Sequence, residues 1–271
     1  MLVIDTDIQK AKSQPKKLPT VITSFNKEGY KRYGADFIRT WLEFWPRSIK
    51  LIVYYEGEES DFDMVPGVSW HPIETVEFLM DYMANLRFPI MHGIVGDKFD
   101  MWFDAGQGRK VCMQMHTMKT IGGKVFWIDA DVVTTRPVPE GFLDQMLPDD
   151  KFNCYLGRDG WYHTETGFIG FNGDHPLARK FSKNYLHTFL TGTIFAQQFF
   201  GRPGWNDCCG FDVTRYLMSC PDEFVNLAKH VPQGHMHPWQ ISATGKYMNH
   251  YKGNRKDTKK LLPEDTAGCT S

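Results

Sequence analysis

Apolar residues in this chain form short unbroken runs, and between the runs they recur every three or four positions. The first run, residues 20–25, is β-branched and aromatic and predicts a buried strand. A helical pattern follows over residues 38–45 and stops before Pro46. Residues 51–55 form a second apolar run. Strand, helix and strand in this order predict a βαβ unit, in which the two strands are parallel and the crossover is right-handed.

The middle of the chain repeats this alternation of runs and helical stripes. The elements predicted there are strands at 125–128, 154–156 and 167–171, a helix ending at the glycine pair 122–123, and helices at 177–189 and 209–217. Such an alternation predicts an α/β fold with an open, mixed and mainly parallel sheet flanked by helices. Ligands of such sheets bind at the carboxyl ends of the strands, so the residues that follow each strand are the first candidates for chemistry.

Composition narrows the class of protein. The chain has 271 residues, of which 42% are hydrophobic, enough for one large core, so it is not intrinsically disordered. A formal net charge of −1 argues against a protein that coats nucleic acid. No apolar run approaches the ~18 residues of a membrane span, and the first residues lack the apolar core of a secretory signal. We therefore expect a cytoplasmic protein with six reduced cysteines.

One pair of acids stands directly after an apolar strand. Asp129 and Asp131 follow the run 125–128, whereas the other two Asp-x-Asp sequences, at 5–7 and 61–63, lie in polar segments. Two carboxylates at the edge of a core repel each other and are costly to desolvate, and a divalent cation removes that cost. Oxygen ligands suit Mn²⁺ or Mg²⁺ carrying a phosphate. The alternative is a pair of turn acids that accept hydrogen bonds from nearby backbone amides.

A basic segment lies near the end of the sequence. Residues 246–260 contain six Lys and Arg residues and one acid, which predicts a local anion site. Within it, His250 can join a metal shell, Gly253 permits close backbone approach, and Lys256 can supply a charge to phosphate. The alternatives are a solvated basic tail and, for the metal, the histidine pair at 235–237.

These two motifs resemble those of glycosyltransferases with the GT-A fold. Asp129-Ala130-Asp131 stands in the place of their Asp-x-Asp motif, and His250-x-x-Gly253-x-x-Lys256 has the spacing found in the retaining, glycogenin-like branch. The resemblance covers roughly residues 19–257 and is strongest to phage and bacterial members. It implies that Asp129, Asp131 and His250 hold the metal, and that Asp129, Ala130, Gly253 and Lys256 contact the donor.

The resemblance also implies roles between and before the two motifs. The strand beginning at Glu165 looks like the acceptor-side strand, and Asp207 looks like the acidic start of the following helix. Asp207 is the preferred catalytic carboxylate and Glu165 the second choice; the alternative for Asp207 is an acid in the first turn of a helix, where its charge interacts favourably with the helix dipole. Lys110 is expected to reach the donor sugar or phosphate, unless it is an ordinary exposed lysine. The nucleoside is expected at the end of the first strand, at Thr23, Ser24, Phe25 and Asn26.

The sequence therefore predicts a flexible leader at 1–18 and a single GT-A-like catalytic domain at 19–271. Its expected reaction is metal-dependent transfer of a sugar from a nucleoside diphosphate sugar, with uridine as the default base, to an acceptor hydroxyl. A glycan, a protein and a hydroxymethylated DNA base all offer such a hydroxyl. The alternatives are a nucleotidyltransferase, which needs a glycine-rich loop where residues 23–29 contain only Gly29, and a non-catalytic sugar-nucleotide-binding protein.

Overall fold

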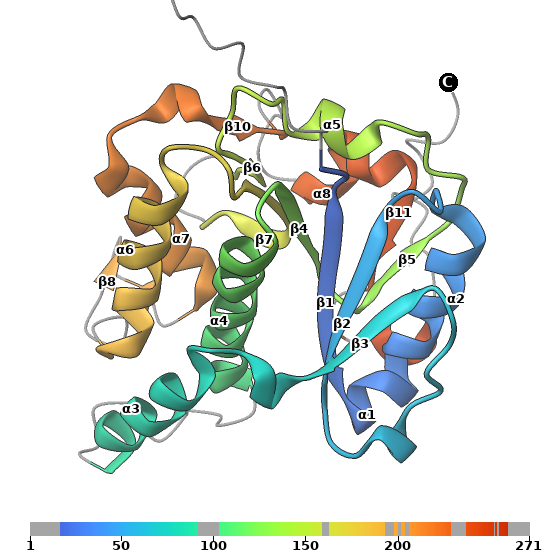
Figure 1. Cartoon of the computed structure of the whole chain (residues 1–271), viewed down its shortest axis with the longest axis horizontal. Coiled ribbons are helices and arrows are strands. Elements are labelled where there is room, and N and C mark those ends of the chain that lie inside the picture. Colours follow the sequence, from blue (N-terminus) through green and yellow to red (C-terminus); the bar gives the residue numbers. More distant parts are fainter. Residues whose placement is uncertain are drawn as a thin grey trace, which may run out of the picture.

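The computed structural model describes residues 17–91, 103–158, 163–192, 198–199, 202–203, 206–228, 237–251, 253 and 255–259. A seven-stranded sheet runs through its centre in the order β10-β6-β7-β4-β1-β2-β3 (Figure 1). The strands are β1 (Thr20–Asn26), β2 (Lys50–Glu56), β3 (Val68–Pro72), β4 (Lys124–Ile128), β6 (Asn153–Leu156), β7 (Glu165–Asn172) and β10 (Phe224–Asn226). Only β7 is antiparallel to its neighbours in this sheet, so the predicted mixed, mainly parallel α/β fold is confirmed.

Two short antiparallel pairs supplement the central sheet. They join β5 (Val132–Thr134) to β11 (Met248–His250), and β8 (Gln198–Phe199) to β9 (Arg202–Pro203). The helices are α1 (Lys27–Gly29), α2 (Ala35–Phe44), α3 (Leu79–Met91), α4 (Phe103–Ile121), α5 (Phe142–Met146), α6 (Ala178–Leu190), α7 (Asp207–Met218), α8 (Pro238–Ile241) and α9 (Arg255–Thr258). A π-helical turn, Tyr30–Gly34, joins α1 to α2, and short 3₁₀ turns lie at Glu59–Asp61, Ile73–Thr75, Pro221–Glu223 and Ala243–Lys246.

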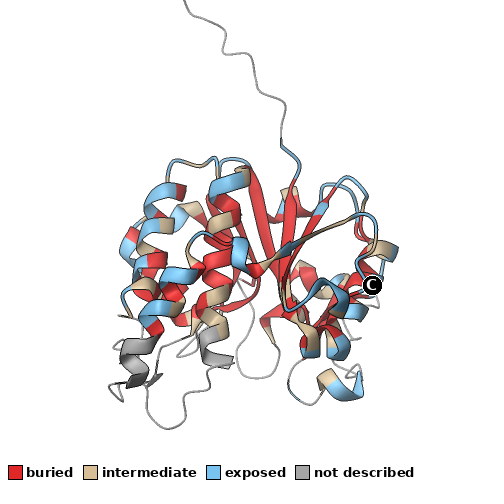
Figure 2. Cartoon of the chain, turned by 60° about the horizontal axis from the view of Figure 1, so that its bottom comes forward, coloured by how far each residue is buried: buried red, intermediate tan, exposed pale blue. Residues whose placement is uncertain are grey.

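Helices cover both faces of the sheet and make two cores. Neighbouring residues of a strand enter opposite cores, as Val21 and Ile22 do, because successive side chains of a strand point to opposite faces. Residues of α4, α6 and α7 pack in one core, and residues of α2, α5 and α8 pack in the other. Figure 2 shows the buried strands between the partly exposed helices. The burial of β2 and β4 on both faces explains why residues 51–55 and 125–128 are apolar without interruption.

The predicted strands and helices are confirmed, with one change in the orientation of a helix. Cys209, Val213 and Leu217, whose helical spacing underlies the predicted helix 209–217, do not form one buried stripe, because Leu217 is 64% exposed. The buried residues of α7 include Phe211, Thr214 and Met218, which have the same helical period in a different phase. Among the described residues no helix is both long and apolar enough to cross a membrane. Most of the predicted leader, 1–18, lies outside the described residues.

Candidate metal centre and its surroundings

The two strand-terminal acids and a distant histidine are brought together by the β5–β11 pair. Asp129 follows β4, and its backbone N–H donates to the carbonyl of Gly167 at 2.8 Å. The chain turns at Asp131 into β5, which pairs with β11 so that Val132 lies opposite His250. The N–H of Tyr251 donates to the carbonyl of Asp131 at 2.8 Å and extends this pairing. This pairing fixes His250 beside Asp131, although the two residues are 119 positions apart in the sequence.

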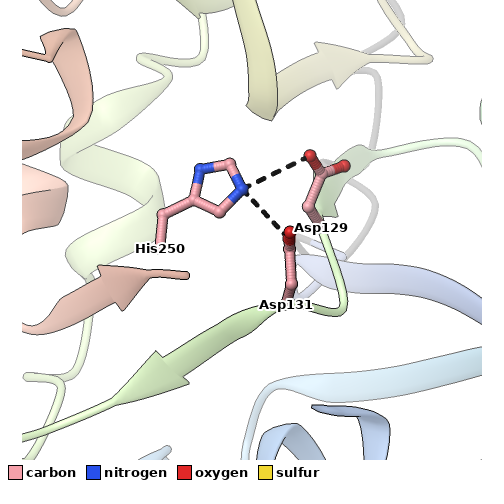
Figure 3. Close-up of side chains that lie close together, drawn as sticks. All are labelled: Asp129, Asp131 and His250. Atoms are coloured by element: carbon pink, nitrogen blue, oxygen red, sulfur yellow. Dashed lines mark ion pairs between the residues drawn. The ribbon is translucent and has the colours of Figure 1, made fainter. Parts of the chain in front are cut away.

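The geometry of these three side chains fits a divalent cation. Nε2 of His250 lies 3.0 Å from Oδ1 of Asp131 and 3.8 Å from Oδ2 of Asp129 (Figure 3). One ligand atom from each residue lies within 4.8 Å of the other two. Neighbouring ligands of an octahedral ion lie roughly 3 Å apart when each bond is about 2.1 Å. The two carboxylates suit Mn²⁺ and Mg²⁺, and the imidazole makes the set a better match for Mn²⁺ than for Mg²⁺, which prefers oxygen ligands.

Backbone lies close to this cluster on one side. A Cβ added to Gly167 would lie 3.0 Å from Oδ2 of Asp129, 3.0 Å from Cε1 of His250 and 2.9 Å from Oε1 of Glu165. Asp131 and His250 are only 7% and 5% exposed. The absence of a side chain at Gly167 therefore leaves the space in which Asp129, His250 and Glu165 approach one another.

Lys256 completes the cluster from the basic segment. Its Nζ lies 2.8 Å from Oδ2 of Asp131. Burial raises the pKa of Asp131, but the charges and hydrogen bonds of His250 and Lys256 outweigh burial and hold that pKa below its ordinary value. Burial lowers the pKa of Lys256, and Asp131 more than reverses this effect, so the pKa of Lys256 is raised. The carboxylate and the ammonium both remain charged at neutral pH.

Lys110 links the cluster to Asp207. Its Nζ lies 3.0 Å from Oδ1 of Asp129 and 2.9 Å from Oδ2 of Asp207, and it donates to the carbonyl of Thr166 at 2.9 Å. The reading of Lys110 as an ordinary exposed lysine is wrong, because the residue is 8% exposed. Burial lowers its pKa, but the charges of Asp129 and Asp207 raise it above the ordinary value. At neutral pH Lys110 is therefore a buried cation between two carboxylates.

The two candidate catalytic carboxylates are both buried, in different environments. Asp207 is 2% exposed at the start of α7, where the side chain of Asn206 caps the helix by accepting from the N–H of Cys209 at 2.8 Å. Oδ2 of Asp207 accepts from the hydroxyl of Thr166 at 2.6 Å. Both oxygens of Glu165, which is 4% exposed, have partners.

Glu165 contacts His237, one of the two histidines of the alternative metal site at 235–237. Oε1 of Glu165 accepts from the N–H of Gly167 at 3.0 Å, and Oε2 is paired with Arg158 and, at 2.9 Å, with Nε2 of His237. His237 thus faces Glu165, and its ring centroid lies 6.0 Å from that of His250. His235 lies outside the described residues.

A cavity of about 240 Å³ opens beside the acids at the carboxyl ends of β1, β2 and β4. Its walls include the predicted residues Ser24, Phe25, Asn26, Asp129, Ala130, Asp131 and Lys256. Thr23 is fully buried in β1, where it pairs with Val53 of β2, and does not line the cavity. Gly253 is exposed and has a positive φ of 58°, a backbone conformation that glycine adopts without strain.

Sequence reasoning missed part of the cavity wall. The residues it did not name are Tyr33, Glu56, Gly106, Gln107, Arg109, Met113 and Trp127. Glu56 ends β2 opposite Asn26, and Nη1 of Arg109 lies 2.8 Å from its Oε1. Glu56 could have been predicted, because ligands bind at the carboxyl ends of neighbouring parallel strands and Glu56 follows the second apolar run. A larger groove of about 1130 Å³ between α3, α4 and α6 contains none of the metal-centre residues.

The comparisons with known proteins support the fold. No protein-family model matches the chain, and no curated protein matches it. Mouse xyloside xylosyltransferase 1, in its apo form, is 13% identical with a TM-score of 0.49, and the match covers 82% of this chain and 90% of that one. The apo structure of the bifunctional glycosyltransferase WbbM is 12% identical with a TM-score of 0.54, over 89% of this chain and 46% of that one. The chain thus spans about half of WbbM and has a GT-A-like α/β fold.

Proposed function

We propose that the chain is a metal-dependent glycosyltransferase that transfers a sugar from a nucleoside diphosphate sugar to an acceptor hydroxyl. The convergence of Asp129, Asp131 and His250 with Lys256, at the mouth of a cavity formed by the ends of β1, β2 and β4, carries this proposal. The fold shared with a glycosyltransferase supports it.

The cluster suits a diphosphate. A Mn²⁺ or Mg²⁺ held by Asp129, Asp131 and His250 would act as a Lewis acid on the diphosphate leaving group. Lys256 supplies a fixed positive charge at the same place, and such preorganised charge stabilises the negative charge that develops on the leaving oxygen. Asp131, which is both a ligand and the ion-pair partner of Lys256, keeps that ammonium at the site.

The cavity is the proposed nucleoside site. Ser24 and Asn26 supply polar groups at the end of β1, and Phe25 and Tyr33 supply aromatic surface. The Glu56–Arg109 pair stands on the wall and offers both a carboxylate and a guanidinium to a base or ribose. We take uridine as the base, which is the default of the resembling family.

Lys110 and Asp207 are the proposed residues at the sugar. Because one ammonium bridges Asp129 and Asp207, Asp207 lies next to the metal ligands. Asp207 is therefore the first choice to orient or deprotonate the acceptor hydroxyl, and Glu165, which is paired with Arg158 and His237, is the second. The spacing of the basic motif favours retention of configuration.

A screen of nucleotide sugars tests the proposal. We expect release of a nucleoside diphosphate from at least one donor with Mn²⁺, and none in EDTA or in the Asp131→Ala variant. Asp150→Ala is the matched control, because Asp150 is 74% exposed and lies outside the cavity. Release of a sugar phosphate in place of the nucleoside diphosphate would contradict the proposal and support a nucleotidyltransferase. Tight binding of a donor without turnover in the presence of hydroxyl acceptors would support a non-catalytic binding protein.

A further inference from the structure

The helix that carries Lys256 is too short to be stable alone. α9 has four residues, and isolated helices shorter than about 12 residues are marginal in water. It follows Gly253, whose positive φ of 58° lets the chain turn from β11 into α9. Tertiary contacts must therefore determine where Lys256 points.

Ion pairs fasten α9 to the segment after β1. Nε and Nη2 of Arg32 donate to the two oxygens of Asp257 at 2.5 and 2.6 Å, a bidentate pair. Nζ of Lys259 lies 2.5 Å from Oδ2 of Asp36 in α2. Two pairs that span the same contact form a small network, which holds a geometry better than a single exposed pair does.

The segment that receives α9 has an uncommon conformation. Tyr30–Gly34 is a π-helical turn, in which the N–H of Ala35 donates to the carbonyl of Tyr30, five residues earlier. Such turns are frequent at functional sites. This one directs Arg32 to Asp257, while the adjacent Tyr33 lines the cavity and lies 5.3 Å below the ammonium of Lys256.

We infer that Arg32 and Asp257 are positioning residues, which together hold Lys256 at the diphosphate site; this inference rests on the proposed function. Arg32 does not line the cavity, and neither does Asp257, so neither side chain contacts a diphosphate bound there. Their side chains are 47% and 57% exposed, so the pair contributes little to overall stability and responds to salt.

The test compares Arg32→Ala, Asp257→Arg and the charge-exchanged double variant Arg32→Asp/Asp257→Arg with the unchanged protein. Two quantities are measured: the affinity for UDP with Mg²⁺, and hydrogen exchange of the backbone amides of residues 255–259 without nucleotide. Lys119→Ala is the matched control, because Lys119 also forms an exposed ion pair, at 2.7 Å to Glu77, away from the cavity.

We expect each single variant to bind UDP 5- to 10-fold more weakly, to raise KM for the donor more than it lowers kcat, and to exchange faster at 255–259. The double variant should restore at least half of the lost affinity, and 1 M salt should remove most of the difference from the unchanged protein. Unchanged exchange and UDP affinity in Arg32→Ala would overturn the inference and leave the proposed function standing. If the variants exchange faster at 255–259 but the unchanged protein binds no nucleoside diphosphate, Arg32 and Asp257 hold α9 in place and the proposed function is overturned.

Discussion

Replacing Lys110 with Met tests whether a buried cation holds the carboxylates of the site together. Met retains most of the side-chain length and removes the ammonium. The Lys110 side chain is 10% exposed and its Nζ lies within 3.0 Å of both Asp129 and Asp207. Without it, Asp207, which is 2% exposed, keeps the hydroxyl of Thr166 but loses its counter-charge.

The size of the effect follows from this burial. Breaking a buried ion pair by removing one partner costs about 3–5 kcal/mol, because a charge stays buried without compensation. Asp129 adds little to this cost, since its side chain is 28% exposed and accepts from Nε1 of Trp127 at 2.6 Å. For a domain of this size 1 kcal/mol corresponds to roughly 2–4 °C, so we expect Tm to fall by about 6–20 °C.

Urea denaturation of Lys110→Met measures the loss directly. Lys119→Met is the control on the same helix, because its ion pair with Glu77 is 57% and 48% exposed and is worth less than about 1 kcal/mol. Adding Asp207→Asn to Lys110→Met should recover part of the stability, because it removes the uncompensated charge. The reasoning is refuted if Lys110→Met loses no more free energy of unfolding than Lys119→Met.

Three further predictions concern single residues of the site and its edge. In a folded Asp207→Asn protein we expect turnover to fall about 10²–10⁴-fold with UDP affinity unchanged, measured by steady-state kinetics; near-normal turnover would transfer the role to Glu165. Gly167→Ala should weaken Mg²⁺-dependent UDP binding at least 10-fold by calorimetry, because the new Cβ would lie 3.0 Å from Asp129 and from His250; unchanged binding would contradict the proposed convergence. Hydrogen bonding to Asp212 raises the pKa of His163 to about 9, so the stability that this pair contributes is complete below pH 6.5 and lost as pH rises to 9. Urea titrations should show this loss in the unchanged protein and not in His163→Gln.

The long strands were predictable from the sequence because they are buried on both faces. Residues 51–55 of β2 and 125–128 of β4 are continuous apolar runs, and burial on both faces favours such runs, whereas β1 also contains Thr23 and Ser24. β5 and β11 have three residues each, too few to show a period of two. The pairing of β5 with β11 places His250 beside Asp131. Because the hydrophobic pattern does not reveal these two strands, only the spacing of His250, Gly253 and Lys256 indicated the contact.

Other parts of the site depend on how elements pack. Lys110 precedes the apolar residue Val111 on α4, and whether its ammonium is buried depends on Asp207, which comes from a helix nearly a hundred residues later. The Glu56–Arg109 pair likewise joins the end of β2 to α4. The helical period of α7 was predictable, but which face of the helix is buried was not. Leu217 and Met218 are both apolar, and packing against α6 buries only Met218. Contacts of this kind require the three-dimensional arrangement.

Thermal unfolding with UDP tests the central claim most directly. Binding at 100 times the dissociation constant adds about 2.7 kcal/mol of stability, which corresponds to a Tm increase of roughly 5–10 °C. The increase should appear with Mn²⁺ or Mg²⁺, disappear in EDTA, and be absent from Asp131→Ala under every condition. An equal increase in EDTA, or a full metal-dependent increase in Asp131→Ala, would contradict a diphosphate site built on Asp129, Asp131 and His250.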